Sequence, residues 1–324
     1  MWLVLPYLAI LVVVVVANIG VSRRGWRWAT YGALAVLNAG AFAWGALALL
    51  LPTLLVLTGA SPEAAEPGAS LRNLGIVTAI GSLIASLCLL RPVRRVLARR
   101  VPLDPTSPVH TAALVLYVHL ASSSLGLLSI GQDWMLGGLQ AVQADVTSVV
   151  SGQVVFLLLA LAGVGLGVRR SLEATLRRLN LHLPTAKQAL LALAATVALL
   201  AIDYGVSRVW EQLWPTNYEQ VMSMSEMLFS QFATPVGALL LGVSAGMGEE
   251  ILFRGALQPR FGLLLTTVLF ACGHVQYGLS PALLEILVMG FALGYVRDRA
   301  NTGTCVLIHA GYNTLSMLLA THWS

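Results

Sequence analysis

Long apolar runs follow one another along the chain and are separated by short polar or charged loops. A helix needs about 20 apolar residues to cross the hydrocarbon core of a membrane. We predict helical segments at residues 2–21, 29–51, 73–91, 109–131, 148–168, 187–206, 234–253, 261–276, 280–296 and 303–320. The segments at 261–276 and 280–296 are short for full spans. The pattern therefore predicts an all-α polytopic membrane helix bundle with about 8–10 transmembrane segments.

The composition supports a lipid environment. The 324 residues are 57% hydrophobic and 10% charged, and their mean hydropathy is +0.81. A soluble domain carries about 25% charged residues, so this chain cannot build a water-solvated surface. Cys88, Cys272 and Cys305 all lie in apolar runs, and their odd number argues against a disulfide framework.

The basic residues alternate from loop to loop. Of the 19 basic residues, all except Arg72 and Arg208 lie in one alternate set of loops. The positive-inside rule explains this pattern better than nucleic-acid binding does, so no nucleic-acid partner is expected. We expect a multi-pass integral protein of a bacterial inner (plasma) membrane, with its N-terminus outside and its arginine-rich loops in the cytoplasm.

Polar residues inside the apolar runs divide the chain into parts. Residues 1–168 are predicted to be N-terminal transmembrane helices of unassigned role, and the first of them lacks the basic start of a secretory signal peptide. Residues 169–186 are predicted to be a basic cytoplasmic linker that forms a surface helix. Residues 187–324 contain nearly all the unusual polar positions.

Two adjacent glutamates occur at the end of one apolar run, in the sequence GMGEEILFR. Ionisable residues inside a membrane segment are costly, and by default they indicate a functional site. Glu250 and Arg254 are four residues apart and can form an ion pair on a helix. Glu249 points about 100° away from Glu250, so it can face a cavity and act as a general base. The alternative is a charged helix end that reaches the membrane surface.

Two further polar motifs occur in the last third of the chain. His274 ends the sequence FACGH, where a single histidine can also be an ordinary hydrogen-bonded packing residue. His309 and Asn313 are four residues apart and share one face of a predicted helix. Two donors aimed at one point can stabilise an oxyanion. A polar contact between packed helices is the alternative interpretation.

The three motifs together form the pattern E-E-x-x-x-R, F-x-x-x-H and H-x-x-x-N within 65 residues. This pattern resembles the CPBP family, the CAAX prenyl endopeptidase and bacteriocin-processing membrane proteins, also called the ABI family. No motif position departs from the pattern. The resemblance covers roughly residues 186–324 and does not reach residues 1–168. It implies an all-α membrane bundle with a polar cavity that cleaves peptide bonds near the bilayer.

The resemblance also implies a role for each motif residue. The first glutamate would activate a water that the FACGH histidine helps to hold, and the last histidine and asparagine would form the oxyanion site. The substrate would be a membrane-associated protein or peptide, of the CAAX, leader or C-terminal sorting-signal type. The expected catalytic residues are Glu249, His274, His309 and Asn313, and the expected supporting residues are Glu250 and Arg254.

Metal dependence is an open alternative. The chain has no H-E-x-x-H motif. Glu249, His274 and His309 could ligate Zn²⁺ with an open fourth position, and Cys272 and Cys305 could add soft ligands. We favour packed roles for the two cysteines. We also favour catalysis without a metal, so no cofactor is expected.

Two other functions fit the same residues. A non-catalytic protein of the same fold, with an immunity or scaffold role, would not need the complete motif set that this chain carries. A proton-coupled transporter would use Glu249, Glu250 and His274 as a relay, but no inverted repeat supports it. Other candidates for lining the site are Gln276, Tyr277 and Glu285, the last of which could instead pair with an arginine.

The topology sets one geometric condition on the site. It places Glu249 and His309 toward the cytoplasmic side, whereas His274 falls near the far end of segment 261–276. The three side chains can meet only if this segment ends inside the bilayer, or if its boundaries differ from those predicted. Glycine and proline residues predict a helix break there, where irregular backbone can line a cavity. They are Gly273, Gly278 and Pro281.

Overall fold

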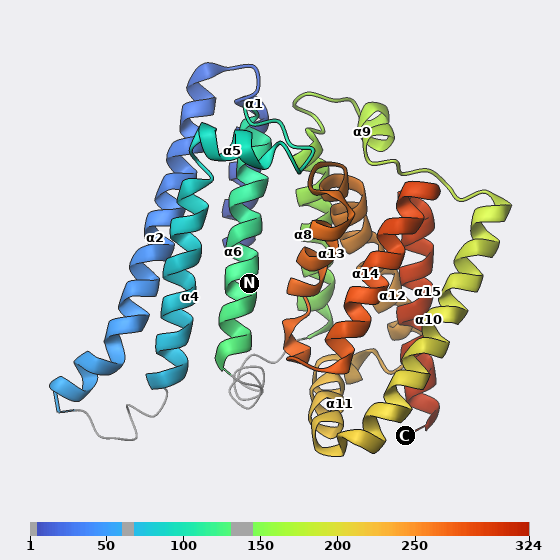
Figure 1. Cartoon of the computed structure of the whole chain (residues 1–324). Coiled ribbons are helices and arrows are strands. Elements are labelled where there is room, and N and C mark those ends of the chain that lie inside the picture. Colours follow the sequence, from blue (N-terminus) through green and yellow to red (C-terminus); the bar gives the residue numbers. More distant parts are fainter. Residues whose placement is uncertain (1–4, 60–67, 131–144, 324) are drawn as a thin grey trace. The chain divides into compact units, whose positions relative to one another are not determined.

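The computed structural model describes residues 5–59, 68–130 and 145–323. Every named secondary-structure element in these residues is a helix, which confirms the predicted all-α bundle (Figure 1). The longer helices are α1 (Leu5–Ile19), α2 (Arg24–Leu57), α4 (Gly68–Leu87), α6 (Pro108–Ile130), α8 (Val146–Val164), α10 (Ala186–Leu213), α11 (Pro215–Phe229), α12 (Pro235–Glu250), α13 (Gln258–Cys272), α14 (Pro281–Arg299) and α15 (Thr302–Trp323). The short ones are α5 (Arg91–Leu97), α9 (Leu172–Arg178), η2 (Ser230–Phe232), η3 (Ile251–Leu257) and η4 (Val275–Tyr277).

Each of the predicted segments coincides with a helix. Among the described residues, six helical runs are long and apolar enough to cross a membrane: α2, α4, α6, α8, α10 and the continuous run Pro235–Cys272. This run includes two of the predicted segments, because α12, η3 and α13 follow one another without a loop. The chain is therefore a multi-pass integral membrane protein. The helix α9 lies inside the basic stretch 169–186 and is capped by Ser171.

The chain forms two compact units. The first consists of Met1–Val15, Leu139–Ala271 and Ser280–Ser324, and it contains α8 to α15. The second consists of Val16–Gly138 and Cys272–Leu279. The helix α8 thus shares a unit with the motif-bearing helices, although its sequence resembles the plain N-terminal spans.

Small residues allow close helix contacts in the second unit. A Cβ atom built on Gly75 of α4 would lie 2.5 Å from the Leu49 backbone nitrogen of α2. Glycine at this position lets the two backbones approach, as is common between membrane helices. The helices α6 and α2 are joined by a polar contact of 2.7 Å between His119 Nε2 and Asn38 Oδ1.

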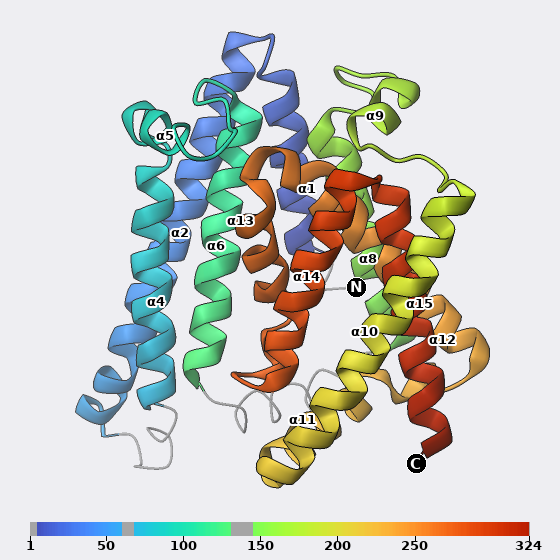
Figure 2. The ribbon, with the colours of Figure 1, turned by 45° about the vertical axis from the view of Figure 1, so that its right-hand side comes forward.

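In the first unit, glycines on two faces of α12 fix its neighbours. A Cβ atom on Gly242 would lie 2.5 Å from the Ala310 carbonyl oxygen of α15, and one on Gly246 would lie 3.0 Å from the Ala310 backbone nitrogen. Gly248 makes the corresponding contact with Gln153 of α8. The helix α12 therefore packs directly against both α8 and α15. The helix α10 also packs against α15 (Figure 2).

The helix α13 is interrupted and short. Gly262 has φ 76° and ψ 172°, a conformation that breaks the helix and that a glycine adopts without strain. The ten residues 263–272 that follow rise only about 15 Å, which is half of the roughly 30 Å hydrocarbon core. The helix ends at Cys272, and Gly278 with φ 64° lies in the turn before α14. The predicted helix break is confirmed, whereas the break at Gly262 was not predicted.

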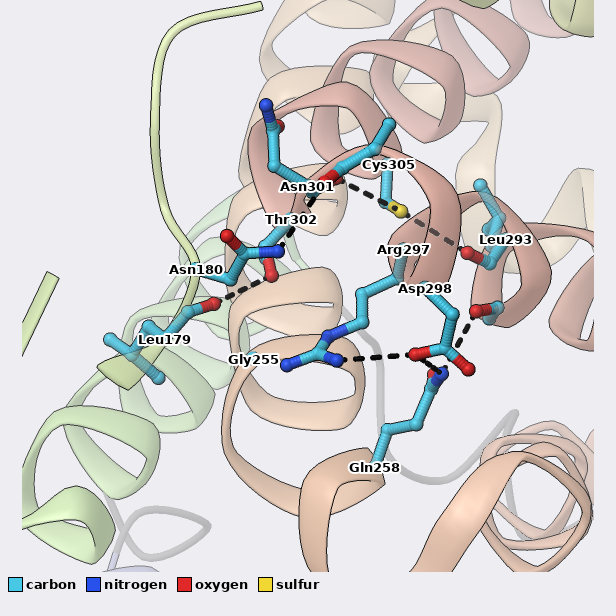
Figure 3. Close-up of polar contacts among 12 residues, drawn as sticks. Leu179, Asn180, Gly255, Gln258, Leu293, Arg297, Asp298, Asn301, Thr302 and Cys305 are labelled. Atoms are coloured by element: carbon cyan, nitrogen blue, oxygen red, sulfur yellow. Dashed lines mark hydrogen bonds and ion pairs between the residues drawn. The ribbon is translucent and has the colours of Figure 1, made fainter. Parts of the chain in front are cut away.

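A polar network joins the ends of several helices in the first unit (Figure 3). Thr302, at the start of α15, donates from its hydroxyl to the Leu179 carbonyl at 2.7 Å and from its backbone nitrogen to the Asn180 carbonyl at 2.9 Å. Gln258 of α13 donates to the Gly294 carbonyl at 2.8 Å and to Asp298 Oδ1 at 3.0 Å. These bonds attach the end of α9 to α15 and hold α13 against α14.

Candidate active site

The helix α12 delivers the two adjacent glutamates. Thr234 caps the start of this helix, since its hydroxyl accepts a hydrogen bond from the Gly237 backbone nitrogen at 3.0 Å, and Pro235 is the first helical residue. It ends with Glu249 and Glu250, and the π-helix η3 follows immediately. π-helical turns are rare and occur often at functional sites. The two carboxylates therefore lie at a change of helical geometry.

Glu250 is the centre of a buried charge network. Its exposed fraction is 0%. Its Oε2 atom lies 3.2 Å from Arg254 Nε, and its Oε1 atom lies 2.9 Å from His309 Nδ1. The ion pair expected from the four-residue spacing is thus present. The charge of Arg254 balances that of Glu250, and His309 contacts the other oxygen, so both oxygens of this carboxylate have a partner.

Arg254 is also completely buried. Its guanidinium carbon lies 4.6 Å from the centre of the Phe270 ring, a cation–π contact. The Phe270 ring also packs edge to face against two other rings. Its centre lies 6.0 Å from that of His309 and 5.3 Å from that of Phe253. Among the described residues, the Nη atoms of Arg254 have no hydrogen-bond acceptor. The phenylalanine of the F-x-x-x-H motif therefore supports the arginine of the first motif.

Glu249 has a different partner from Glu250. It is 7% exposed, and its Oε1 atom accepts a hydrogen bond of 2.9 Å from Gln153 Nε2 of α8. Gln153 is a neutral amide, which orients the carboxylate without neutralising its charge. The two glutamates thus differ in their contacts: Glu250 contacts Arg254 and His309, and Glu249 accepts a hydrogen bond from the amide of Gln153.

His309 and Asn313 occupy one face of α15, as predicted from their spacing. His309 is 2% exposed and uses Nδ1 for its contact with Glu250. Its Nε2 atom, on the other side of the ring, can then face a reacting group. Asn313 follows one helical turn later and is half-buried.

His274 lies just after the end of α13, where it precedes the short helix η4. It has non-helical backbone angles and is half-buried. The residues Cys272–Leu279 belong to the second compact unit, whereas both glutamates, Arg254 and His309 belong to the first. Its participation in the site therefore stays a prediction.

Gln153 is a site residue that the sequence reasoning missed. It interrupts the apolar run VVSGQVVF of α8, and a lone amide in such a run was the available signal. Asp203 of α10 was also missed; it accepts a hydrogen bond from Tyr312, next to Asn313. Asp203 lies close enough to Glu285 to interact with it electrostatically. None of the ion pairs among the described residues includes Glu285.

Metal binding is the alternative that the sequence leaves open for this site. Within the described ranges, no group of three or more histidine, cysteine, aspartate or glutamate side chains is arranged to hold a metal ion. Cys305 is buried, and its thiol donates to the Leu293 carbonyl at 3.2 Å, as expected for a packed residue. Catalysis without a metal stays a prediction, with Zn²⁺ as the alternative.

The close contact between α8 and α12 at Gly248 predicts that adding one methyl group at this position strongly lowers the stability of the protein. A Cβ atom there would lie 2.6 Å from the Gln153 carbonyl oxygen and 2.9 Å from its Cα atom, and neither backbone atom can move alone. We expect Gly248→Ala to separate α8 from α12 and to destabilise the protein by about 1–3 kcal/mol. Thermal unfolding in detergent measures this change.

The matched control is Gly152→Ala, one residue before Gln153 on α8. No heavy atom lies within 4 Å of a Cβ atom built there. Alanine also favours the helix more than glycine does. We expect this variant to unfold at the wild-type temperature or above it. Equal melting temperatures for both variants would contradict the close α8–α12 contact.

A comparison with known families supports the predicted resemblance. Residues 231–315 match the model of the type II CAAX prenyl endopeptidase Rce1-like family. The matched stretch includes all three motifs, so the resemblance is confirmed for this part of the chain. No curated protein and no solved structure gives a significant match.

Proposed function

We propose that this protein is an intramembrane endopeptidase that hydrolyses a peptide bond of a membrane-associated protein or peptide. The observation that carries the proposal is the unequal environment of two adjacent buried glutamates. Glu250 contacts Arg254 and His309, while Glu249 contacts the amide of Gln153. A carboxylate held in this way is suited to act as a general base.

In the proposed reaction, Glu249 takes a proton from a water molecule, and the resulting hydroxide attacks the carbonyl carbon of the scissile bond. Asn313 and His309 stabilise the negative charge on the carbonyl oxygen. Glu249 then returns the proton to the leaving amine, and the peptide bond breaks. The resemblance implies that His274 helps to hold this water molecule. Donation from His309 Nε2 requires the imidazolium form, for which the two glutamates supply the countercharge.

The matched family points to a CAAX-type substrate, a protein or peptide with an isoprenylated C-terminal region. A leader peptide or a C-terminal sorting signal is the alternative substrate in a cell without prenylated proteins. The proposed location is a bacterial inner membrane, and the loop charges favour an orientation with the N-terminus outside and the arginine-rich loops in the cytoplasm. Catalysis without a metal remains part of the proposal.

Cleavage by the purified full chain in proteoliposomes tests the proposal. Peptides that end in an isoprenylated CAAX sequence, a leader sequence or a sorting sequence are incubated separately, and the products are identified by mass spectrometry. We expect hydrolysis of one class at a single bond. Proton uptake coupled to solute transport, without any product, would instead support a transporter. Partner assembly that needs neither Glu249 nor His309 would support a scaffold.

Gln153 is proposed as a positioning residue for Glu249. We expect Gln153→Leu to lower kcat about 10–100-fold, because a hydrogen bond to a charged group contributes about 1.5–3 kcal/mol. KM should stay unchanged, since Gln153 contacts the base rather than the substrate in this proposal. Steady-state kinetics with the identified peptide separate the two parameters.

The matched control for this variant is Gln220→Leu, the same substitution at a half-buried position of α11. It should keep both kcat and KM. Gln153→Glu provides a further readout, because the introduced carboxyl group can donate to Glu249 only when it is protonated. We expect that variant to regain activity as the pH falls. A Gln153→Leu enzyme with unchanged kcat would contradict the positioning role.

A further inference from the structure

Several arginines from separate parts of the first unit lie close enough to act on one another electrostatically. Arg178, at the end of α9, donates from Nη1 to the Gly255 carbonyl at 3.2 Å and from Nη2 to the Ala256 carbonyl at 3.5 Å. These bonds hold α9 against η3, immediately before Arg260. The network of Figure 3 holds Arg297 and α14 against the same region. The arginine cluster consists of Arg169, Arg170, Arg178, Arg260 and Arg297.

The positive charge of the arginine cluster is poorly balanced. Asp298 contacts Arg297 at 3.1 Å and also accepts from Gln258. The nearby Glu173 pairs with Arg177 on the exposed side of α9. In the part of the chain that the structure describes, Arg170, Arg178 and Arg260 form no ion pair with a carboxylate. The cluster therefore has an excess of positive charge.

Two arginines of the cluster, Arg169 and Arg178, have a lowered pKa. Burial, together with the neighbouring positive charges of the cluster, lowers the pKa of Arg178 to about 10. Burial, Arg170 and Arg260 together lower the pKa of Arg169 as well. Side chains that repel one another in a partly buried place are stabilised by an anion that lies between them. Guanidinium groups match the oxygens of a phosphate in a bidentate geometry.

Exposed apolar side chains flank the arginine cluster. Val168, Leu172 and Leu183 are 42%, 60% and 93% exposed, and all lie within or beside the basic stretch around α9. A segment that exposes both arginine and leucine is typical of the membrane interface. A soluble phosphate would gain nothing from these apolar groups, whereas a phospholipid offers both a phosphate and acyl chains.

We propose that the arginine cluster is a binding site for the phosphate group of an anionic phospholipid. The guanidinium groups contact the headgroup, and the apolar side chains around α9 lie against the upper acyl chains. Basic pockets between membrane helices bind anionic headgroups by this chemistry. Because α9 is bonded to both η3 and α15, the lipid would hold together helix ends that are far apart in the sequence. The proposal is independent of the peptidase function.

Lipid binding by the full chain tests this site. The protein is purified in a neutral detergent and titrated with phosphatidylglycerol or phosphatidylcholine, and bound lipid is counted by native mass spectrometry. We expect preferential retention of phosphatidylglycerol. Each arginine should contribute about fivefold in affinity, equivalent to about 1 kcal/mol. Arg260→Gln should therefore weaken binding about fivefold, and Arg178→Gln with Arg260→Gln about 25-fold.

The matched control is Arg99→Gln with Arg100→Gln, two exposed arginines outside the cluster. This variant should bind phosphatidylglycerol as the wild type does. Arg260 forms no ion pair within the described ranges. If loss of Arg178 prevents folding, the single variant Arg260→Gln therefore tests the lipid site by itself. Wild-type affinity in Arg260→Gln would overturn the proposal. Equal retention of both lipids, or complete displacement by millimolar inorganic phosphate, would also overturn it.

Discussion

Glu249→Gln is expected to lower the rate of peptide hydrolysis about 10²–10⁴-fold, the range that general-base catalysis contributes. Glutamine has nearly the same shape as glutamate but cannot take a proton from water. Its side-chain oxygen can still accept the hydrogen bond that Gln153 donates to Glu249. The variant should therefore fold normally and bind the substrate, with the loss confined to kcat. Single-turnover cleavage in proteoliposomes measures it.

Glu226→Gln is the matched control for this prediction. It makes the same substitution at an exposed position of α11. We expect wild-type turnover from this variant. Undiminished turnover of Glu249→Gln would exclude Glu249 as the base, even if cleavage itself were established.

The Glu250–Arg254 pair predicts the largest effect on stability. Both side chains are completely buried, and their closest atoms are 3.2 Å apart. Removing one partner of a buried pair leaves a buried charge without compensation, which costs about 3–5 kcal/mol. We expect Arg254→Leu to destabilise the protein by this amount, since Glu250 would keep its contact with His309 but lose the permanent charge of the arginine. Thermal unfolding in detergent measures the loss.

Two further variants separate this explanation from a general packing defect. The double variant Glu250→Leu with Arg254→Leu removes both charges, so it should be more stable than Arg254→Leu alone. The exposed pair of Arg208 and Glu211 is the control, since Arg208→Leu should cost less than about 1 kcal/mol. A double variant less stable than the single one would contradict an uncompensated charge.

The sequence predicted the features that depend on local spacing. Hydropathy located the long apolar helices because membrane spans must be long and apolar, whereas the helix α11 falls in none of the predicted segments. Spacing of four residues placed Glu250 beside Arg254, and it placed His309 and Asn313 on one face of α15. The break after Cys272 followed from glycine and proline in the next few residues.

Features that depend on contacts between distant segments could not be predicted. Gln153 meets Glu249 across 96 positions of sequence, and nothing in the run around it indicates a partner on α12. The helical break at Gly262 depends on a positive φ angle that many glycines do not adopt. The π-helical turn after Glu250 also has no local sequence pattern. His274 is recognised by its motif alone, and its role stays a prediction.

The central claim is that Glu249 of this membrane protein cleaves peptide bonds. The most direct test compares the termini of all membrane proteins in cells that express the wild type or Glu249→Gln at equal levels. Mass spectrometry of the terminal peptides should find mature ends that occur only with the wild type, together with uncleaved precursors in the variant. Identical sets of termini in the two membranes would contradict the proposed function.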